Sequence, residues 1–279
     1  METSKNTRKR IIDYLEEGKR FDGRKLLELR NLEIETGISI NSEGSARVRL
    51  GQTEVVAGVK LDIGAPYPNE LNRGTLVVTT ELLPMASERF EYGPPSIAAI
   101  EISRIVDRTV RESKFINFEK LCVKEGEKVW CIFLDIYPIN DAGNLADAAC
   151  IASVAALLSA VFPKYDEKIE RVVYGEFTDK KLPLSGNVPL LLTFHKIGGN
   201  IVIDPITEEE DASDVKISLG MTKDKEVKIN AGQKEKETAF PREEIFEIFD
   251  KAEDCFEKIH PVILEKIKKA IESPSQRKD

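Results

Sequence analysis

One segment, Leu145–Phe162, constrains the fold of this chain more than any other. Its sequence, LADAACIASVAALLSAVF, is rich in alanine and apolar on almost every side when drawn as a helix. A helix without a polar face is buried, because no side of it is suited to contact with water. We therefore expect this helix inside the molecule, with sheet and helix packed around it.

The other hydrophobic patterns predict strands both before and after this helix. Alternating or valine-rich runs are typical of strands, and apolar residues spaced three and four apart are typical of helices. Strands are expected at 32–36, 46–50, 53–63, 75–83, 128–137, 171–174, 188–194, 201–203, 215–221 and 226–229, and further helices at 4–17, 97–114 and 243–271. This order predicts an α+β, or mixed α/β, fold made by one domain over residues 1–279, since the sequence shows no repeat or linker.

The charge of the chain limits how it can meet a polyanion. Its 279 residues hold 49 Asp and Glu against 41 Lys and Arg, which gives a formal net charge of −8. An acidic surface repels nucleic acid at long range. A chain of this composition can bind nucleic acid only through a local basic patch, or together with a more basic partner.

The sequence lacks the signals of several protein classes. The first 18 residues hold no signal-peptide core, and no run approaches 18 apolar residues, so we expect a cytoplasmic protein without a membrane span. The four cysteines lack CxxC spacing and the two histidines lie far apart, which argues against a metal site or a histidine-centred triad. GxxxxGK[ST], GxGxxG and GxSxG loops are absent, so no cofactor is expected. We interpret the acidic run 208–211 as an exposed turn.

Three arginines form a stripe on the predicted helix 97–114. At about 100° per residue, Arg104, Arg108 and Arg111 fall within a narrow arc opposite the apolar face. Guanidinium groups in a row suit the phosphates of RNA, since arginine is always charged and can hold phosphate through two hydrogen bonds. The alternative is an ordinary solvated helix face, because acidic residues flank the stripe.

Short motifs in a fixed order resemble the ribonuclease PH superfamily. RFDGR at 20–24 and ELR at 28–30 are similar to its opening signature, and GSA at 44–46 with LGQTEV at 50–55 continue it. The stripe helix, the following strand, the turn at 141–143 and the alanine-rich helix keep the same layout. Within the superfamily, the runs at 106–108, 111–114 and 129–137 look most like the non-catalytic ring subunit of the archaeal RNA exosome.

This resemblance implies an assembly as well as a fold. The fold would be similar to the second domain of ribosomal protein S5, and three copies of the chain would alternate with three copies of a catalytic relative in a hexameric ring. RNA would pass through a central channel, under a cap of RNA-binding subunits. The stripe helix would face the point where RNA enters the partner's active site, so Arg104, Arg108 and Arg111 are predicted to bind RNA, with Arg108 the first choice. Arg73, in the loop 68–74, is predicted to line the channel and bind RNA, and the alternative is a plain surface loop.

The resemblance also implies that this chain has lost the chemistry of its active relatives. Active members cleave RNA from its 3′ end by phosphorolysis, and a Gly-[Ser/Thr]-Arg turn before the buried helix holds the phosphate. Here that turn reads Gly143-Asn144-Leu145, and leucine cannot bind an anion. Active members also carry two aspartates six residues apart. Alignment on Pro189 puts Lys181 and Asn187 in their places, with Asp179 as an alternative for the first.

We therefore predict a chain with no catalytic residue of its own, no metal and no cofactor. It would bind RNA and help to structure the active site of a catalytic ribonuclease PH-like partner. The alternative is a phosphorolytic 3′–5′ exoribonuclease that is active by itself. A third hypothesis is a small-molecule enzyme on a similar fold, such as a kinase, but no glycine-rich phosphate loop supports it.

Overall fold

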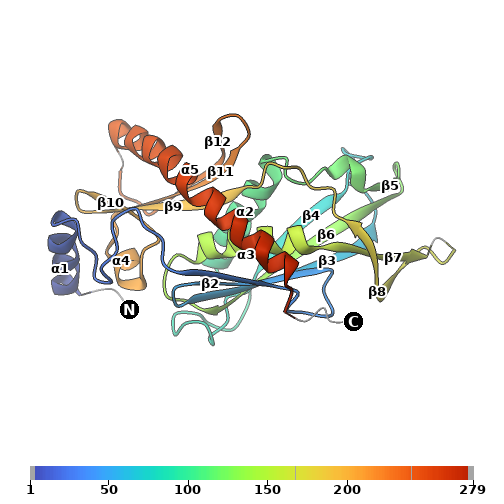
Figure 1. The fold of residues 1–279 in the computed structure, drawn as a ribbon, viewed down its shortest axis with the longest axis horizontal. Helices are drawn as coiled ribbons and strands as arrows, with labels where there is room; N and C mark the ends of the chain where they lie inside the picture. Colours follow the sequence, from blue (N-terminus) through green and yellow to red (C-terminus); the bar gives the residue numbers. More distant parts are fainter. Residues whose placement is uncertain (1–3, 167, 240, 276–279) are drawn as a thin grey trace.

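Two antiparallel-rich sheets and a central helix make up the body of the protein (Figure 1). The computed structural model describes residues 4–166, 168–239 and 241–275. The central helix, α3 (Leu145–Ser159), packs on strands of the first sheet and on β9 (Leu190–Ile197) of the second. Every residue from Leu145 to Leu157 is buried, as the apolar sequence of this segment predicts.

The first sheet lies on one side of α3 and has the order β1-β2-β3-β6-β4. Its strands are β1 (Leu32–Thr36), β2 (Gly44–Leu50), β3 (Thr53–Gly64), β4 (Thr75–Thr80) and β6 (Lys128–Asn140), with β5 (Cys122–Lys124) paired to β6. All pairs are antiparallel except β4 with β6, which is parallel. The parallel crossover between β4 and β6 contains α2 (Ile97–Glu112), and this connection positions the arginine stripe.

The second sheet is fully antiparallel, in the order β10-β9-β11-β12. Besides β9 it contains β10 (Asn200–Ile203), β11 (Val215–Lys223) and β12 (Val227–Glu235). The remaining helices are α1 (Lys5–Glu16), α4 (Thr207–Ala212), α5 (Arg242–Glu272) and a short 3-10 helix at Phe118–Leu121. One hydrophobic cluster runs through both sheets, α2, α3 and α5, so the two halves of the chain share a core.

The alanine-rich helix is shorter than its sequence predicts. It ends at Ser159, and Val161–Asp166 forms strand β7, which pairs with β8 (Arg171–Lys181) in a hairpin that projects from the body (Figure 1). Pro163 explains the difference, because proline disfavours a helical conformation in the residue before it and has no N–H for the helix. The predicted helix over 145–162 is therefore wrong in its last three residues.

Candidate functional site

Helix α2 is held against the second sheet by an unusually close approach. Ser96 Oγ accepts a hydrogen bond from Ala99 N, at 3.3 Å, and begins the helix, as expected for an N-cap serine. Where α2 crosses β11, a Cβ on Gly220 would lie 2.3 Å from Thr109 Oγ1. Only glycine allows this contact, which fixes the rotation of α2 and turns the arginine stripe outward.

Arg104 and Arg108 line one groove on the outer side of α2. The groove has a volume of about 330 Å³ and is completed by Val78, Ser103 and Asp107. Arg104 is exposed, and within the described part of the chain it has no hydrogen-bond or ion-pair partner. It is therefore the arginine of the stripe that can take up a phosphate without breaking an existing contact.

Arg108 is half-buried, and a residue of the second sheet holds its side chain in place. Its Nη2 donates a hydrogen bond to Gln233 Oε1 on β12, at 2.5 Å. Its Nε is buried and has no acceptor among the described residues. A buried N–H without an acceptor is unfavourable. A ligand in the groove that supplies an acceptor would satisfy the Nε–H of Arg108, and this would favour its binding.

Arg111 is already engaged on two sides. It forms an ion pair with Asp107, one turn earlier on α2, and donates to Leu76 O on β4, at 2.9 Å. The hydrogen bond to Asp107 is the main cause of a raised pKa at Arg111, ahead of the opposing effect of burial. These contacts anchor α2 to the edge strand of the first sheet, and they leave Arg111 less able than Arg104 to bind an anion.

The structure brings Arg73 next to the stripe, which the sequence alone did not show. The guanidinium carbons of Arg73 and Arg111 both lie 5.7 Å from the centre of the Phe118 ring. Arg73 also forms an ion pair with Glu70, at 2.5 Å. Phe118 thus holds the loop arginine and the helix arginine on one surface, through cation–π contacts.

The turn at the start of α3 is shaped by Gly143. Gly143 has φ +89°, and a Cβ there would lie 2.5 Å from Pro205 O, so the turn packs directly on the chain that follows β10. Asn144 is the N-cap, and its backbone N–H donates to Glu210 Oε2, at 3.0 Å. Its side-chain amide donates to Asp204 Oδ1, also at 3.0 Å. Two carboxylates therefore meet at this turn.

The two carboxylates at this turn are not those at the positions aligned on Pro189. Asp204 and Glu210 stand six residues apart, the spacing that active ribonuclease PH relatives are expected to show. Lys181 instead lines a cavity with Ser159, at the opposite end of α3. A helix of 15 residues is about 22 Å long, so the region of Lys181 cannot contribute to the turn. The structure thus places Lys181 away from the turn, and Asp204 and Glu210 beside it.

The interpretation of 208–211 as an exposed turn is also wrong. The segment forms α4, and Glu209 is buried in an ion pair with Arg20. Burial acts to raise the pKa of Glu210, but Lys216, His195 and the Asn144 backbone amide outweigh it, and the pKa falls to about 2. Arg20, the partner of Glu209, lies 189 residues away, and no local pattern indicates this contact.

Asp204 is neutralised by arginines of the opening motif. It is fully buried and accepts hydrogen bonds from Arg24 Nη1, at 3.1 Å, and from Arg30 Nη2, at 2.6 Å. Arg30 also donates to Ala142 O and Gly143 O, at 2.8 and 3.0 Å. The motif residues at 20–30 therefore serve to lock the turn and its acids together, a role that their local sequence does not indicate.

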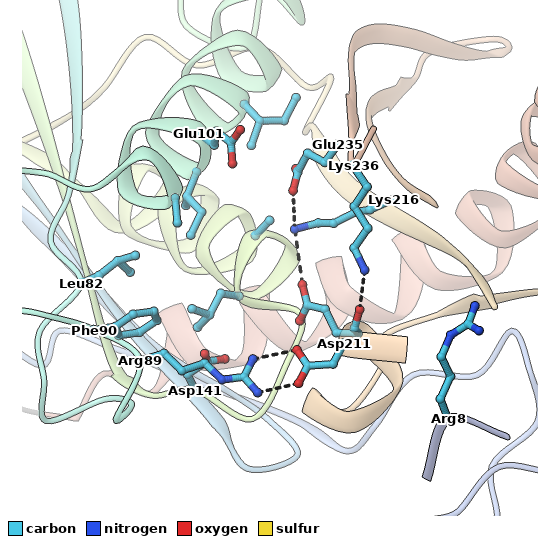
Figure 2. A pocket seen from close by; sticks show the side chains of 16 residues that line it. Arg8, Leu82, Arg89, Phe90, Glu101, Asp141, Asp211, Lys216, Glu235 and Lys236 are labelled. Atoms are coloured by element: carbon cyan, nitrogen blue, oxygen red, sulfur yellow. Dashed lines mark hydrogen bonds and ion pairs between the residues drawn. The ribbon is translucent and has the colours of Figure 1, made fainter. Parts of the chain in front are cut away.

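A cavity of about 620 Å³ opens in front of this turn (Figure 2). Among its cations, Arg89 pairs with Asp211 at 2.8 and 2.6 Å and Lys216 pairs with Glu235 at 2.9 Å, while Lys236 donates to the backbone oxygens of Glu210 and Ser213. Figure 2 shows these pairs side by side. Leu145 adds an apolar side chain where active relatives are expected to have arginine. Because four basic and five acidic side chains line the cavity, it has no excess of positive charge for a free phosphate.

Two further findings concern metals and membranes. Within the ranges that the structure describes, no group of three or more His, Cys, Asp or Glu side chains is arranged to hold a metal ion. The described helices include none that is both long and apolar enough to cross a membrane. The four cysteines are unpaired, with Cys150 and Cys255 buried.

Beside the turn, Asp147 makes stability depend on pH. Burial raises its pKa to about 7, against the lowering effect of hydrogen bonds from Thr193 and Asn144. The folded protein therefore keeps a proton that the unfolded chain releases above about pH 4, so stability falls as the pH rises from 4 to 7. Asp147→Asn removes this dependence. Between pH 5 and 8, we expect the wild type to lose roughly 3 kcal/mol more unfolding free energy than the variant.

Urea unfolding of both proteins at several pH values measures this difference. His195 is also buried, and its pKa is lowered to about 3, which destabilises the fold in acid. That effect is common to both proteins and cancels in the comparison. Parallel pH profiles for the wild type and Asp147→Asn would show that Asp147 is ionised in the folded state.

The chain is similar in sequence to two family models and to known proteins. A model described as the 3′ exoribonuclease family, domain 1, matches residues 28–163, and domain 2 of the same family matches residues 187–255. The exosome complex component Rrp42 of Methanothermobacter thermautotrophicus is 46% identical over 239 residues, 86% of this chain and 87% of its own length. The protein of the same name from Pyrococcus horikoshii is 42% identical over 266 residues, 94% of this chain and 95% of its own.

Solved structures agree with these matches. A chain of a structure described as the Archaeoglobus fulgidus exosome with RNA bound to the active site has a TM-score of 0.81 and 36% identity, covering 92% of this chain and 97% of its own. Rice Rrp46 has a TM-score of 0.64 at 16% identity and supports the fold alone. The predicted mixed helix-and-sheet fold and the resemblance are confirmed: the chain belongs to the 3′ exoribonuclease family, with a ribonuclease PH-like fold.

Proposed function

We propose that this chain is a non-catalytic subunit of an exosome, which binds RNA and helps to structure the active site of a ribonuclease PH-like partner. One observation carries the proposal. The turn Gly143-Asn144-Leu145 lacks an arginine, and the cations of the cavity before it are held by carboxylates or backbone carbonyls, while Arg104 on the outer surface has no partner among the described residues. An anion would therefore find an unpaired arginine on the outer surface of the chain, whereas the cations at the position of a catalytic site are already engaged.

The proposed assembly is a ring of three heterodimers around a channel for RNA, with RNA-binding cap subunits on one face, in the cytoplasm. Similarity to proteins named exosome complex component Rrp42, and to a chain of a structure described as an archaeal exosome core, supports this assembly. The chain's net charge of −8 is compatible with it, since an acidic chain binds RNA through a local basic patch or together with a more basic partner.

Among the predicted RNA-binding residues, the contacts favour Arg104 and Arg108. Arg104 is unpaired within the described chain, and Arg108 has a buried Nε without an acceptor there. Arg111 and Arg73 would bind RNA only in competition with Asp107 and Glu70. We propose that the first two contact the RNA backbone, and that the second pair shapes the adjoining surface around Phe118.

A second candidate function is phosphorolysis by the chain itself. The observation in its favour is that Asp204 and Glu210 keep a six-residue spacing beside the turn. Against it, Asp204 is buried between Arg24 and Arg30, and Glu210 pairs with Lys216, so neither carboxylate is available as a proton donor or metal ligand. We therefore place catalysis in the partner.

Reconstitution tests the proposal. We expect the purified chain alone to show no phosphate-dependent shortening of single-stranded RNA, because it has no free positive site for the attacking phosphate. The chain mixed with a catalytic ribonuclease PH-like subunit should shorten RNA and release nucleoside diphosphates. Reactions without phosphate, and the partner alone, are the controls. Release of nucleoside diphosphates by this chain alone would overturn the proposal in favour of the second candidate.

A further inference from the structure

The cavity in front of the turn before α3 has the size and the lining of a small-molecule site. Its volume is about 620 Å³, and four of its lining residues, Leu82, Phe90, Ile102 and Leu145, bring large apolar side chains. Pockets for small molecules typically measure about 300–1,000 Å³ and combine apolar walls with a few polar groups. The function proposed above assigns no ligand to this cavity, although it is large enough to hold one.

The four cations of this cavity are already held by oxygen atoms. Arg8 pairs with Asp214, which does not line the cavity, and Lys236 donates to two backbone carbonyls. Arg89 and Lys216 pair with carboxylates of the cavity itself, which are Asp211, Glu210 and Glu235. These contacts occupy every cation and three of the five acids that line the cavity.

The two remaining carboxylates, Glu101 and Asp141, have no cationic partner among the described residues. Glu101 is half-buried on α2 and makes neither a hydrogen bond nor an ion pair there. Asp141 is half-buried and accepts a hydrogen bond from Gly143 N, at 3.1 Å. Figure 2 shows Glu101 and Asp141 in separate parts of the cavity that both line. The groups left for a ligand are therefore two separated carboxylates and an apolar wall.

The surroundings of Asp141 disfavour its negative charge. Burial is the largest cause of the raised pKa of Asp141, and the charge of Glu210 acts in the same direction. The backbone N–H of Gly143 and the charges of Arg89 and Lys216 act to lower this pKa, but they do not outweigh burial. A further positive charge in the cavity would stabilise the ionised carboxylate, so the site favours a cationic ligand.

We propose that this cavity binds a linear aliphatic polyamine, whose ammonium groups contact Glu101 and Asp141 and whose methylene groups lie against the apolar wall. A molecule of this kind carries separated positive charges on an apolar chain, which matches the separated carboxylates and the wall between the polar groups. A hard metal ion needs several oxygen ligands around one point, and two carboxylates in separate parts of a cavity do not supply them. An inorganic anion would meet only cations that are already held.

Titration calorimetry with spermidine tests the proposal on the purified full-length chain. We expect one spermidine to bind per chain, and Glu101→Gln combined with Asp141→Asn to lower its affinity at least tenfold, because two charge-assisted contacts are weakened. Asparagine at 141 can still accept the hydrogen bond from Gly143 N, so the variant should fold, and circular dichroism checks this. Butylamine has a single ammonium group and should bind at least tenfold more weakly than spermidine.

A matched variant controls for the acidity of the whole chain. Asp250 and Glu253 are exposed on α5 and have no partner among the described residues, so Asp250→Asn with Glu253→Gln removes the same charge away from the cavity. This control should bind spermidine as the wild type does. An equal loss in both double variants, or no binding to the wild type, would overturn the proposal. Displacement of spermidine by Mg²⁺, beyond the effect of NaCl at equal ionic strength, would assign the cavity to a metal ion instead.

Discussion

Replacing Arg104 and Arg108 together with alanine is expected to weaken RNA binding by the assembled ring about 25-fold or more. Each charge-assisted hydrogen bond to phosphate contributes about 1–3 kcal/mol, equal to about 5- to 150-fold in affinity. Fluorescence anisotropy with a labelled single-stranded RNA measures the loss. The dependence of log affinity on log salt should become shallower by about 0.7 for each phosphate contact removed.

A control variant separates the effect of net charge on RNA binding from the effect of where the arginines lie. Arg10 and Arg171 are exposed arginines on α1 and β8, and their double alanine variant removes the same net charge away from α2. It should bind RNA nearly as well as the wild type. An equal loss in both double variants would mean that RNA responds only to net charge, and an unchanged affinity for the Arg104 and Arg108 variant would exclude the stripe from RNA binding.

Arg30→Met is expected to destabilise the chain by about 3–5 kcal/mol, the cost of removing one partner from a buried ion pair. Arg30 is nearly buried, pairs with the fully buried Asp204, and donates to two carbonyls of the turn before α3. Without it, Arg24 is the one charged partner that Asp204 keeps among the described residues. Chemical denaturation monitored by circular dichroism measures the change in unfolding free energy.

A double-mutant cycle identifies the cause. Asp204→Asn removes the buried charge, so the double variant should lose less stability than the sum of the two single variants. Arg49→Met is the matched control, because Arg49 pairs with Glu35 and Glu54 on the exposed face of the first sheet and should contribute little. Additive losses in the cycle would show that Arg30 acts through its carbonyl contacts alone.

Much of the fold follows from patterns within single elements. The burial of α3 follows from its apolar sequence, and the outward arginines of α2 follow from helical spacing. These features depend on residues within one or two turns of each other, which is why the sequence predicts them. The end of α3 was missed because Val161 and Phe162 continue its apolar pattern into a strand, and only Pro163 signalled the change.

The candidate site was harder to predict. Alignment on Pro189 directs attention to 181–187, whereas the acids that contact the turn in the structure are Asp204 and Glu210. Asp204 directly follows the buried strand β10, and its six-residue spacing to Glu210 is visible in the sequence. The partners of Asp204, Arg24 and Arg30, lie 180 and 174 residues away, and no local pattern indicates such contacts.

The family, the buried helix, the arginine stripe and the leucine in the turn can all be predicted from the amino-acid sequence, because each depends on residue identity and short-range spacing. Which acids meet the turn, and which arginines of the stripe keep free donors, depends on the tertiary packing. Asn144 meets Asp204 across 60 residues, and Arg108 meets Gln233 across 125. Such contacts depend on how the sheets pack around α3, so the charge available to a ligand is set by packing rather than by composition.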